Sequence, residues 1–347
     1  MSRIAASMFT SKLFWPLVML GALFAINMVA FPGFFTIELK NGHLFGSLVD
    51  IVRNGAPTLI IAIGMTLVIA TRGIDLSVGA VCAIAGAVAC SIILGSSQPG
   101  RVSTVVVAVL AALAIALLLG LWNGVLVAVL GIQPIIATLI LMTAGRGVAM
   151  LITEGQILTV NSPPFKVLGS GFVFGIPVAV VIAVVIFAAA VLLTRQTALG
   201  LLIESVGINP EASRQAGLRS RGLLLTVYAF CALCAAIAGL VLTSNQTAAD
   251  ANNTGLFIEL DAILAVVIGG TSLVGGRYSL VGTLVGALVI QTLVTTVYTV
   301  GIPPIATMVF KAAVITLVCL LQSPATAAAF SRWRRRVVPA SHKQVIA

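Results

Sequence analysis

The stretch Arg195-Gln-Thr-Ala-Leu-Gly-Leu-Leu-Ile-Glu-Ser-Val-Gly-Ile-Asn-Pro-Glu-Ala-Ser-Arg-Gln-Ala-Gly-Leu-Arg-Ser-Arg221 interrupts a chain that otherwise carries almost no charge. Within it, Asn209 suits the N-cap of a helix, Pro210 the first helical position and Glu211 the positive end of the helix dipole. Gly217 suits the position just past the C-terminus. The stretch therefore predicts a capped helix of about two turns on the cytoplasmic side, where another protein could grip it.

The composition predicts a polytopic membrane protein of the all-α class. The 347 residues are 60% hydrophobic and 8% charged, and the mean hydropathy is +1.19, whereas a soluble domain carries about 25% charged residues. A helix needs about 20 apolar residues to cross a bilayer core, and such runs recur from Leu13 to Gln322. We expect about ten transmembrane helices, at roughly 13–31, 48–70, 75–95, 103–130, 134–153, 177–194, 222–243, 260–274, 280–300 and 304–322.

Three parts follow from this division. Residues 1–12 form a cytoplasmic N-terminus, 13–322 a transmembrane domain with the cytoplasmic loop 195–221, and 323–347 a basic cytoplasmic tail. The N-terminal apolar run resembles a signal peptide, but it is long and no clear small-residue cleavage site follows it, so we expect an uncleaved first span.

Lysine and arginine favour one side of the predicted spans. With the N-terminus inside, most of them fall in inner loops, which is the pattern of the positive-inside rule, and both termini are then cytoplasmic. The net charge of +10 therefore reflects membrane topology, and no basic face with interleaved aromatic residues indicates nucleic-acid binding. The residues expected on the inner side are Arg3, Lys12, Arg72, Arg195, Arg214, Arg219, Arg221, Arg277, Arg332, Arg334, Arg335, Arg336 and Lys343. Those expected on the outer side are Lys40, Arg53, Arg101 and Lys166.

Glycine spacing predicts close contacts between helices. The pairs Gly120/Gly124 and Gly282/Gly286 are four residues apart, and small residues at this spacing let helices approach closely. Residues 67–88 and 264–290 share an apolar run, an interruption that contains glycine, and a Val-Gly start to the next span. Paired interruptions of this kind mark transport pathways at repeat interfaces. The similarity is loose and leaves a true internal repeat open.

The sequence contains no recognisable catalytic constellation. H-E-x-x-H and G-x-S-x-G are absent, and the two histidines lie outside any metal-ligand spacing. No lysine follows a glycine, so the chain has no Walker A loop and any ATP hydrolysis belongs to another polypeptide. We expect no metal and no cofactor. The cysteines, including the pair Cys231 and Cys234, are interpreted as buried apolar residues.

Charged and polar residues inside the predicted spans are candidates for function. Arg146 and Lys311 fall in the outer half of the membrane. They either pair with nearby carboxylates or point outward, or else they line a polar mouth. Asp75 could pair with Arg72, and Asn123 is expected to make an interhelical hydrogen bond. The carboxylates near the outer side are Glu154, Asp250, Glu259 and Asp261.

The outer side offers no aromatic platform on which a sugar could stack. Trp15, Trp122 and Trp333 all fall near the cytoplasmic side, where tryptophan usually anchors the chain at the interface. A transporter that does not hold its cargo tightly needs a separate donor protein that does.

Several motifs resemble the membrane-spanning permease subunits of ribose/galactose-type ABC importers, from about residue 45 to 322. The chain is most similar to the galactofuranose permeases within that family. It departs from the common pattern at Arg72, where the family commonly has a glycine. The family motifs are Gly73-Ile-Asp-Leu-Ser-Val-Gly79, Gly145-Arg-Gly147, Val206-Gly-Ile-Asn-Pro-Glu-Ala-Ser-Arg-Gln-Ala-Gly217, Glu259-Leu-Asp-Ala-Ile-Leu-Ala-Val-Val-Ile-Gly-Gly-Thr-Ser-Leu-Val-Gly-Gly276 and Lys311-Ala-Ala-Val-Ile315. The galactofuranose-type stretches are Phe45-Gly-Ser-Leu-Val-Asp50, Leu121-Trp-Asn-Gly124, Gln133-Pro134 and Ala249-Asp-Ala-Asn-Asn253.

The resemblance implies an ATP-driven sugar importer in a bacterial inner membrane. Two identical or related permease subunits would form the pathway, two cytoplasmic ABC ATPase subunits would bind the inner face, and a periplasmic binding protein would deliver a small sugar of the galactofuranose or ribose type. The residues implied for ATPase coupling are Gly207, Asn209, Pro210, Glu211, Ala212, Ala216 and Gly217. The candidate substrate pathway is Asp75, Asn123, Arg146 and Lys311. The candidate binding-protein contacts are Lys40, Arg53, Arg101 and Lys166.

An ion-coupled secondary transporter of a small polar solute is the main alternative. It predicts an ionisable relay of Asp, Glu or His inside the membrane, whereas the clear intramembrane charges here are basic. The missing catalytic residues make an intramembrane enzyme a weaker hypothesis, and a scaffold without transport activity stays open.

Overall fold

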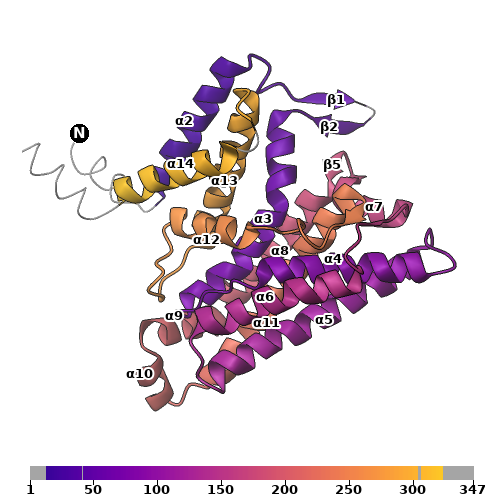
Figure 1. Ribbon diagram of the computed structural model, residues 1–347. Helices are drawn as coiled ribbons and strands as arrows, with labels where there is room; N and C mark the ends of the chain where they lie inside the picture. Colours follow the sequence, from indigo (N-terminus) through magenta and orange to yellow (C-terminus); the bar gives the residue numbers. More distant parts are fainter. Residues whose placement is uncertain (1–12, 41, 304–305, 323–347) are drawn as a thin grey trace, which may run out of the picture.

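The computed structural model describes residues 13–40, 42–303 and 306–322, and the predicted N-terminal segment 1–12 and tail 323–347 lie outside the described residues. The chain folds into a helical bundle with small hairpins along one end (Figure 1). The helices are α2 (Phe14–Ala30), α3 (Ser47–Ala70), α4 (Val78–Gly95), α5 (Val102–Ala128), α6 (Pro134–Ile152), α7 (Pro163–Ser170), α8 (Val178–Gln196), α9 (Leu199–Ile208), α10 (Pro210–Gln215), α11 (Ser220–Gln246), α12 (Ile258–Ile268), α13 (Leu280–Thr299) and α14 (Thr307–Gln322).

Three short antiparallel hairpins or strand pairs accompany the helices and were not predicted. All of their strands lie in segments that connect helices, where the apolar pattern of the spans carries no information about them. The fold is therefore mostly helical, as predicted, with small strand pairs added. These are β1 (Glu38–Lys40) with β2 (His43–Phe45), β3 (Leu158–Thr159) with β6 (Ala248–Ala249), and β4 (Phe172–Val173) with β5 (Ile176–Pro177).

Helix α11 lies at the centre of the bundle, in contact with α3, α4 and α5. Small residues allow this close approach. A Cβ atom added to Gly64 of α3 would lie 2.8 Å from Cys231 Cα, and one added to Gly120 of α5 would lie 2.7 Å from Ala232 Cβ. The cysteines Cys82, Cys90, Cys231 and Cys234 are buried and free, as the sequence predicted.

Both predicted glycine pairs lie at helix contacts. Gly120 and Gly124 face α11, where a Cβ on Gly124 would lie 2.9 Å from a methyl carbon of Leu225. Gly282 and Gly286 face α12 so closely that an added Cβ would overlap the backbone there. The prediction of close helix packing at these glycines is confirmed.

Seven helices of the described residues are long and apolar enough to cross a membrane, namely α3, α4, α5, α6, α8, α11 and α13. The predicted span 260–274 is wrong in extent, because α12 has only 11 residues and is about 16 Å long at 1.5 Å per residue. The preceding segment 247–257 contains Asn, Asp, Thr and Gly, which favour turns over helix. It packs irregularly along α4, and a Cβ on Gly255 would lie 2.9 Å from Cys82 Cβ.

Two further breaks in the helices lie within the stretches 67–88 and 264–290, whose sequences share a pattern. Residues 71–77 lie between α3 and α4, and residues 269–279 lie between α12 and α13. The two breaks touch, since the backbone amide of Gly276 donates a hydrogen bond of 2.9 Å to the carbonyl oxygen of Ala70. The shared pattern of 67–88 and 264–290 thus corresponds to two helix–break–helix units that meet at one point.

The contact between α11 and α4 gives a stability prediction. A Cβ on Gly239 would lie 2.6 Å from Cys82 Cα, whereas one on Gly222 of the same helix would meet nothing within 4 Å. We expect Gly239→Ala to lower the Tm of the detergent-purified protein, because overpacking costs about 1–3 kcal/mol. Gly222→Ala is the matched control and should leave the Tm unchanged or slightly raised, because alanine is the better helix former. Equal Tm values for Gly239→Ala and the unaltered protein would contradict this packing.

Candidate functional site

The polar loop holds a short capped helix, as the sequence predicted. The side-chain oxygen of Asn209 accepts hydrogen bonds from the backbone amides of Glu211 (3.1 Å) and Ala212 (3.0 Å). Gly217 has a φ of +83°, the left-handed conformation typical just past a helix C-terminus. The helix α10 has six residues, so it is shorter than the predicted two turns. Helix α9 precedes it directly and was not predicted.

Helix α10 projects from one end of the bundle, at the opposite end from the β1–β2 hairpin (Figure 1). Its residues are exposed except for Ser213. Arg214 forms an ion pair of 2.7 Å with Glu211, and this hydrogen bond lowers the pKa of the Glu211 carboxyl. Such an exposed pair adds little to stability, so these charges remain available to a partner surface.

The residues expected to take part in coupling divide into two groups. Asn209, Pro210, Glu211, Ala212, Ala216 and Gly217 are exposed on or beside α10. Gly207 is buried at the end of α9, where an added Cβ would overlap the carbonyl oxygen of Ala70 and lie 2.6 Å from the backbone nitrogen of Gly276. Gly207 therefore contacts the helix breaks inside the protein.

The expected pairing of Arg72 with Asp75 is wrong. Arg72 Nε donates a hydrogen bond of 2.6 Å to the carbonyl oxygen of Gly207, and Nη2 donates to the carbonyl oxygen of Ile208. These carbonyls end α9, and the last carbonyls of a helix lack intrahelical partners and carry the negative end of its dipole. A cation therefore binds there more readily than a neutral side chain would.

Asp75 and Asn123 belong to one buried hydrogen-bonded chain. Ser77 donates to Asp75 Oδ1 through its backbone amide (3.0 Å) and its hydroxyl (2.6 Å). Asn123 of α5 donates to the Ser77 hydroxyl oxygen over 2.9 Å, so the expected interhelical bond is instead a bond from α5 to the N-cap residue of α4. Asp75 and Asn123 are each 1% exposed, so neither reaches the surface of the single chain. Their hydrogen bonds fix the conformation of the break 71–77.

Thr138 of α6 also supports this break, and the sequence analysis missed it. Its hydroxyl oxygen accepts from the backbone amide of Leu76 (3.1 Å) and lies 3.2 Å from the carbonyl oxygen of Ile74. The only signal in the sequence was a hydroxyl side chain in the first turns of an apolar span. A hydroxyl of this kind satisfies backbone groups that a broken helix leaves free.

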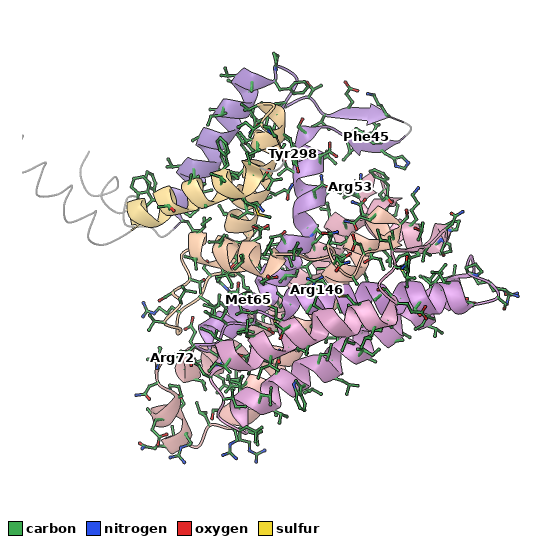
Figure 2. All side chains as sticks on the ribbon, viewed as in Figure 1. Phe45, Arg53, Met65, Arg72, Arg146 and Tyr298 are labelled. Atoms are coloured by element: carbon green, nitrogen blue, oxygen red, sulfur yellow. The ribbon has the colours of Figure 1, made fainter. Side chains whose placement is uncertain are left out.

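Arg146 reaches from α6 to the irregular segment 247–257, near the centre of the molecule in Figure 2. Its Nη1 donates to the carbonyl oxygens of Ala251 (2.9 Å) and Thr254 (2.8 Å). Glu259 and Asp250 add favourable electrostatic interactions. Carboxylates thus act on Arg146 through electrostatics, as one of the alternatives expected, but its hydrogen bonds are to backbone carbonyls that non-helical structure leaves without partners.

Lys311 pairs with a carboxylate, as one of the two predictions for it required. Its Nζ lies 2.9 and 2.7 Å from the two carboxylate oxygens of Asp261, and each side chain is 21% exposed. The pair joins α14 to α12. Of the four residues expected to line the pathway, Asp75 and Asn123 thus lie together, while Arg146 and Lys311 occupy separate places.

The four basic residues expected on the outer side differ in accessibility. Arg101 and Lys166 are exposed, and Lys40 pairs with Glu38 at 2.5 Å in the β1–β2 hairpin. Arg53 is partly buried in α3 and donates to Asn245 Oδ1 over 2.9 Å.

The β1–β2 and β4–β5 hairpins contact each other and form one layer. The backbone amide of Leu44 donates to the carbonyl oxygen of Gly175 over 3.0 Å. The rings of His43 and Phe172 stack with their centroids 4.4 Å apart. Phe174, at the tip of the second hairpin, is fully exposed, so this layer presents an apolar surface.

Comparison with known proteins relates this arrangement to transport. Residues 47–319 match the family described as "Branched-chain amino acid transport system / permease component". The chain is 50% identical over 315 residues to the galactofuranose transporter permease protein YtfT of Escherichia coli (strain K12). This alignment covers 89% of this chain and 90% of that protein. It is 42% identical to the fructose import permease protein FruF of Bifidobacterium longum (strain NCC 2705), over 93% of this chain and 91% of the other.

A further relative is the ribose import permease protein RbsC of Escherichia coli (strain K12), which is 39% identical over 88% of this chain and 92% of its own. No solved structure matches the chain. The family match covers well over half of the chain, and these relatives align with it along nearly their whole lengths. This chain therefore belongs to the branched-chain amino acid transport system / permease component family, as an ABC importer permease of the ribose and galactose type, and it is a transport subunit rather than an enzyme.

Proposed function

We propose that this chain passes a small sugar of the galactofuranose or ribose type from a periplasmic binding protein to the cytoplasm, driven by ATP hydrolysis on a separate subunit. The exposed, capped helix α10 carries the proposal. It offers a rigid surface at one end of the bundle, and the chain has no Walker A loop of its own. The sugars in the names of the relatives, galactofuranose first among them, support the substrate class.

The complex that this function requires has three kinds of partner. Two ABC ATPase subunits bind the inner face and receive α10, with Asn209, Pro210, Glu211, Ala212, Ala216 and Gly217 on the contact surface. A second permease subunit, identical or related, completes the pathway within the lipid bilayer. A periplasmic sugar-binding protein docks at the end of the bundle opposite α10, where Lys40, Arg101 and Lys166 are exposed basic residues. Nucleic acid has no part in this complex.

The proposed topology has ten crossings with both termini in the cytoplasm of a bacterial inner membrane. Helices α2 and α14 add two crossings to the seven long helices, and segment 247–257 with α12 forms one composite crossing. The charge distribution supports this orientation, because arginines cluster around the α9–α10 end. These arginines are Arg72, Arg195, Arg214, Arg219, Arg221 and Arg277.

The substrate pathway includes the neighbourhoods of Asp75, Asn123, Arg146 and Lys311. Arg146 and Lys311 hold the segment 247–268 against α6 and α14 through hydrogen bonds and an ion pair. Asp75 and Asn123 hold the break 71–77. We propose that these residues shape the pathway by fixing its irregular backbone.

Altering the charge of α10 should uncouple transport. Glu211→Lys with Ala212→Asp reverses the charge at position 211 and moves the carboxylate of the first turn one residue along, so a negative charge stays near the positive end of the helix dipole while the charge pattern of the contact surface changes. We expect sugar uptake to fall about tenfold or more while membrane insertion persists. A tenfold change corresponds to the loss of about 1.4 kcal/mol of binding energy between α10 and the ATPase. Sugar uptake and ATP hydrolysis are measured in proteoliposomes that contain the ATPase subunits and the binding protein.

Glu211→Asp is the control for this experiment, because it keeps the negative charge near the N-terminus of α10, and it should transport at nearly the normal rate. Normal uptake by the double variant would count against the coupling role of α10.

Single introduced thiols test the orientation. Gln215→Cys in α10 and Leu39→Cys in β1 replace exposed residues at opposite ends of the bundle. In intact cells with a permeable outer membrane, an impermeant maleimide should label residue 39 and not residue 215, and inside-out vesicles should reverse the result. Labelling of residue 215 from outside would overturn the proposed topology and with it the coupling role of the loop.

A further inference from the structure

We infer that Arg72 is a positioning residue that transmits movement of α10 to the helix breaks at the inner end of the bundle. The inference rests on the proposed ATP-driven function and adds a specific mechanical link to it. Figure 2 labels Arg72 at the inner end of the bundle, beside the α9–α10 region. Three segments far apart in sequence meet at this residue.

The first contact binds Arg72 to the end of α9. Its guanidinium donates to the carbonyl oxygens of Gly207 and Ile208. The next residue, Asn209, is both the last cap of α9 and the N-cap of α10. The planar guanidinium fixes direction as well as distance when it donates to two acceptors. Because only Asn209 separates α9 from α10, a displacement of α10 moves the end of α9 and with it Arg72.

The second contact joins Arg72 to the other break. A Cβ atom on Gly275 would overlap the Arg72 side-chain carbon Cγ, so the Gly275–Gly276 turn rests directly on the aliphatic part of that side chain. The backbone amide of Gly276 donates to the Ala70 carbonyl oxygen over 2.9 Å. Gly207 lies directly against the carbonyl oxygen of Ala70 and the backbone nitrogen of Gly276. Gly207 and Gly275 thus leave no room for a side chain of their own at these contacts, so the three segments meet backbone to backbone while the Arg72 side chain stays exposed to solvent.

The backbone of Arg72 indicates that its side chain has a specific task. Its φ of +65° lies in the left-handed region, which glycine adopts readily and L residues rarely do. A residue persists in this conformation where its surroundings hold it there. Arginine at this position is explained by the guanidinium contacts, because the turn alone would favour glycine.

The break 71–77 carries the movement inward. Beyond Arg72 it is tied to α5 through Asp75, Ser77 and Asn123, and to α6 through Thr138. Helix α4 begins directly after Ser77. A shift of Arg72 therefore acts on the start of α4 through a segment that is hydrogen-bonded to two neighbouring helices.

Variants at Arg72 test this link in the complete transporter. Arg72→Gly keeps the left-handed turn without strain and removes both guanidinium contacts. Arg72→Lys keeps the charge but lacks the fork of donors. Arg221→Ala is the control, because Arg221 is an exposed arginine at the same end, in the first turn of α11. The number of sugar molecules imported per ATP hydrolysed is measured in proteoliposomes with ATPase subunits and binding protein.

We expect Arg72→Gly to lower the uptake per ATP about tenfold, within the range typical of coupling between two sites, while ATP hydrolysis and assembly persist. Arg72→Lys should give an intermediate ratio and Arg221→Ala the normal one. An unchanged ratio in Arg72→Gly, or an equal loss of uptake and hydrolysis in both Arg72 variants, would overturn the inference.

The unaltered protein separates this inference from the proposed function. Uptake by it that does not depend on ATP would contradict the proposed function. ATP-driven uptake by it together with full coupling in Arg72→Gly would contradict only the role of Arg72. If Arg72→Gly does not assemble, the ratio in Arg72→Lys decides, because a normal ratio there overturns the inference and a lowered one supports it.

Discussion

Backbone amides and carbonyls inside a membrane must find partners within the protein, and this requirement determines where the polar residues of this chain lie. Three segments depart from helical structure within the bundle, at 71–77, 247–257 and 269–279. Thr138 serves the first, Arg146 the second, and the amide of Gly276 connects the third to the end of α3. Polar residues that the sequence suggested as functional candidates thus form hydrogen bonds that satisfy the backbone.

The interruptions in turn depend on glycine at the places where backbones meet. Gly207, Gly239 and Gly282 all lie so close to a neighbouring segment that a side chain would displace it. Close contact without side chains leaves little freedom for one segment to move independently of the next, because packed interiors transmit displacement. The end of the bundle that carries α9 and α10 therefore combines an irregular backbone with tightly fitted contacts between segments.

The features predictable from sequence were those with local signals. Asn209, Pro210 and Gly217 marked the ends of α10 because capping acts within a few residues of a helix end. The pairing of Lys311 with a carboxylate was one of the alternatives that the scarcity of charge in the spans suggested, beside a polar mouth. In contrast, Arg72 was assigned to Asp75, the nearest carboxylate in sequence, whereas its partner Gly207 is 135 residues away. The backbone carbonyls that bind Arg146 could not be predicted either, because every residue has a carbonyl and the sequence does not show which ones lack partners. The span predicted at 260–274 overran the end of α12, because apolar composition alone does not tell helix from irregular structure.

The ion pair between Lys311 and Asp261 has an electrical consequence. Moving one elementary charge through the membrane potential changes its energy by about 2.3 kcal/mol per 100 mV. A cation and an anion held 2.7 Å apart that shift together carry no net charge, so the field does almost no work on them. Joining α14 to α12 through this neutral pair therefore adds no net charge on which the membrane potential could act.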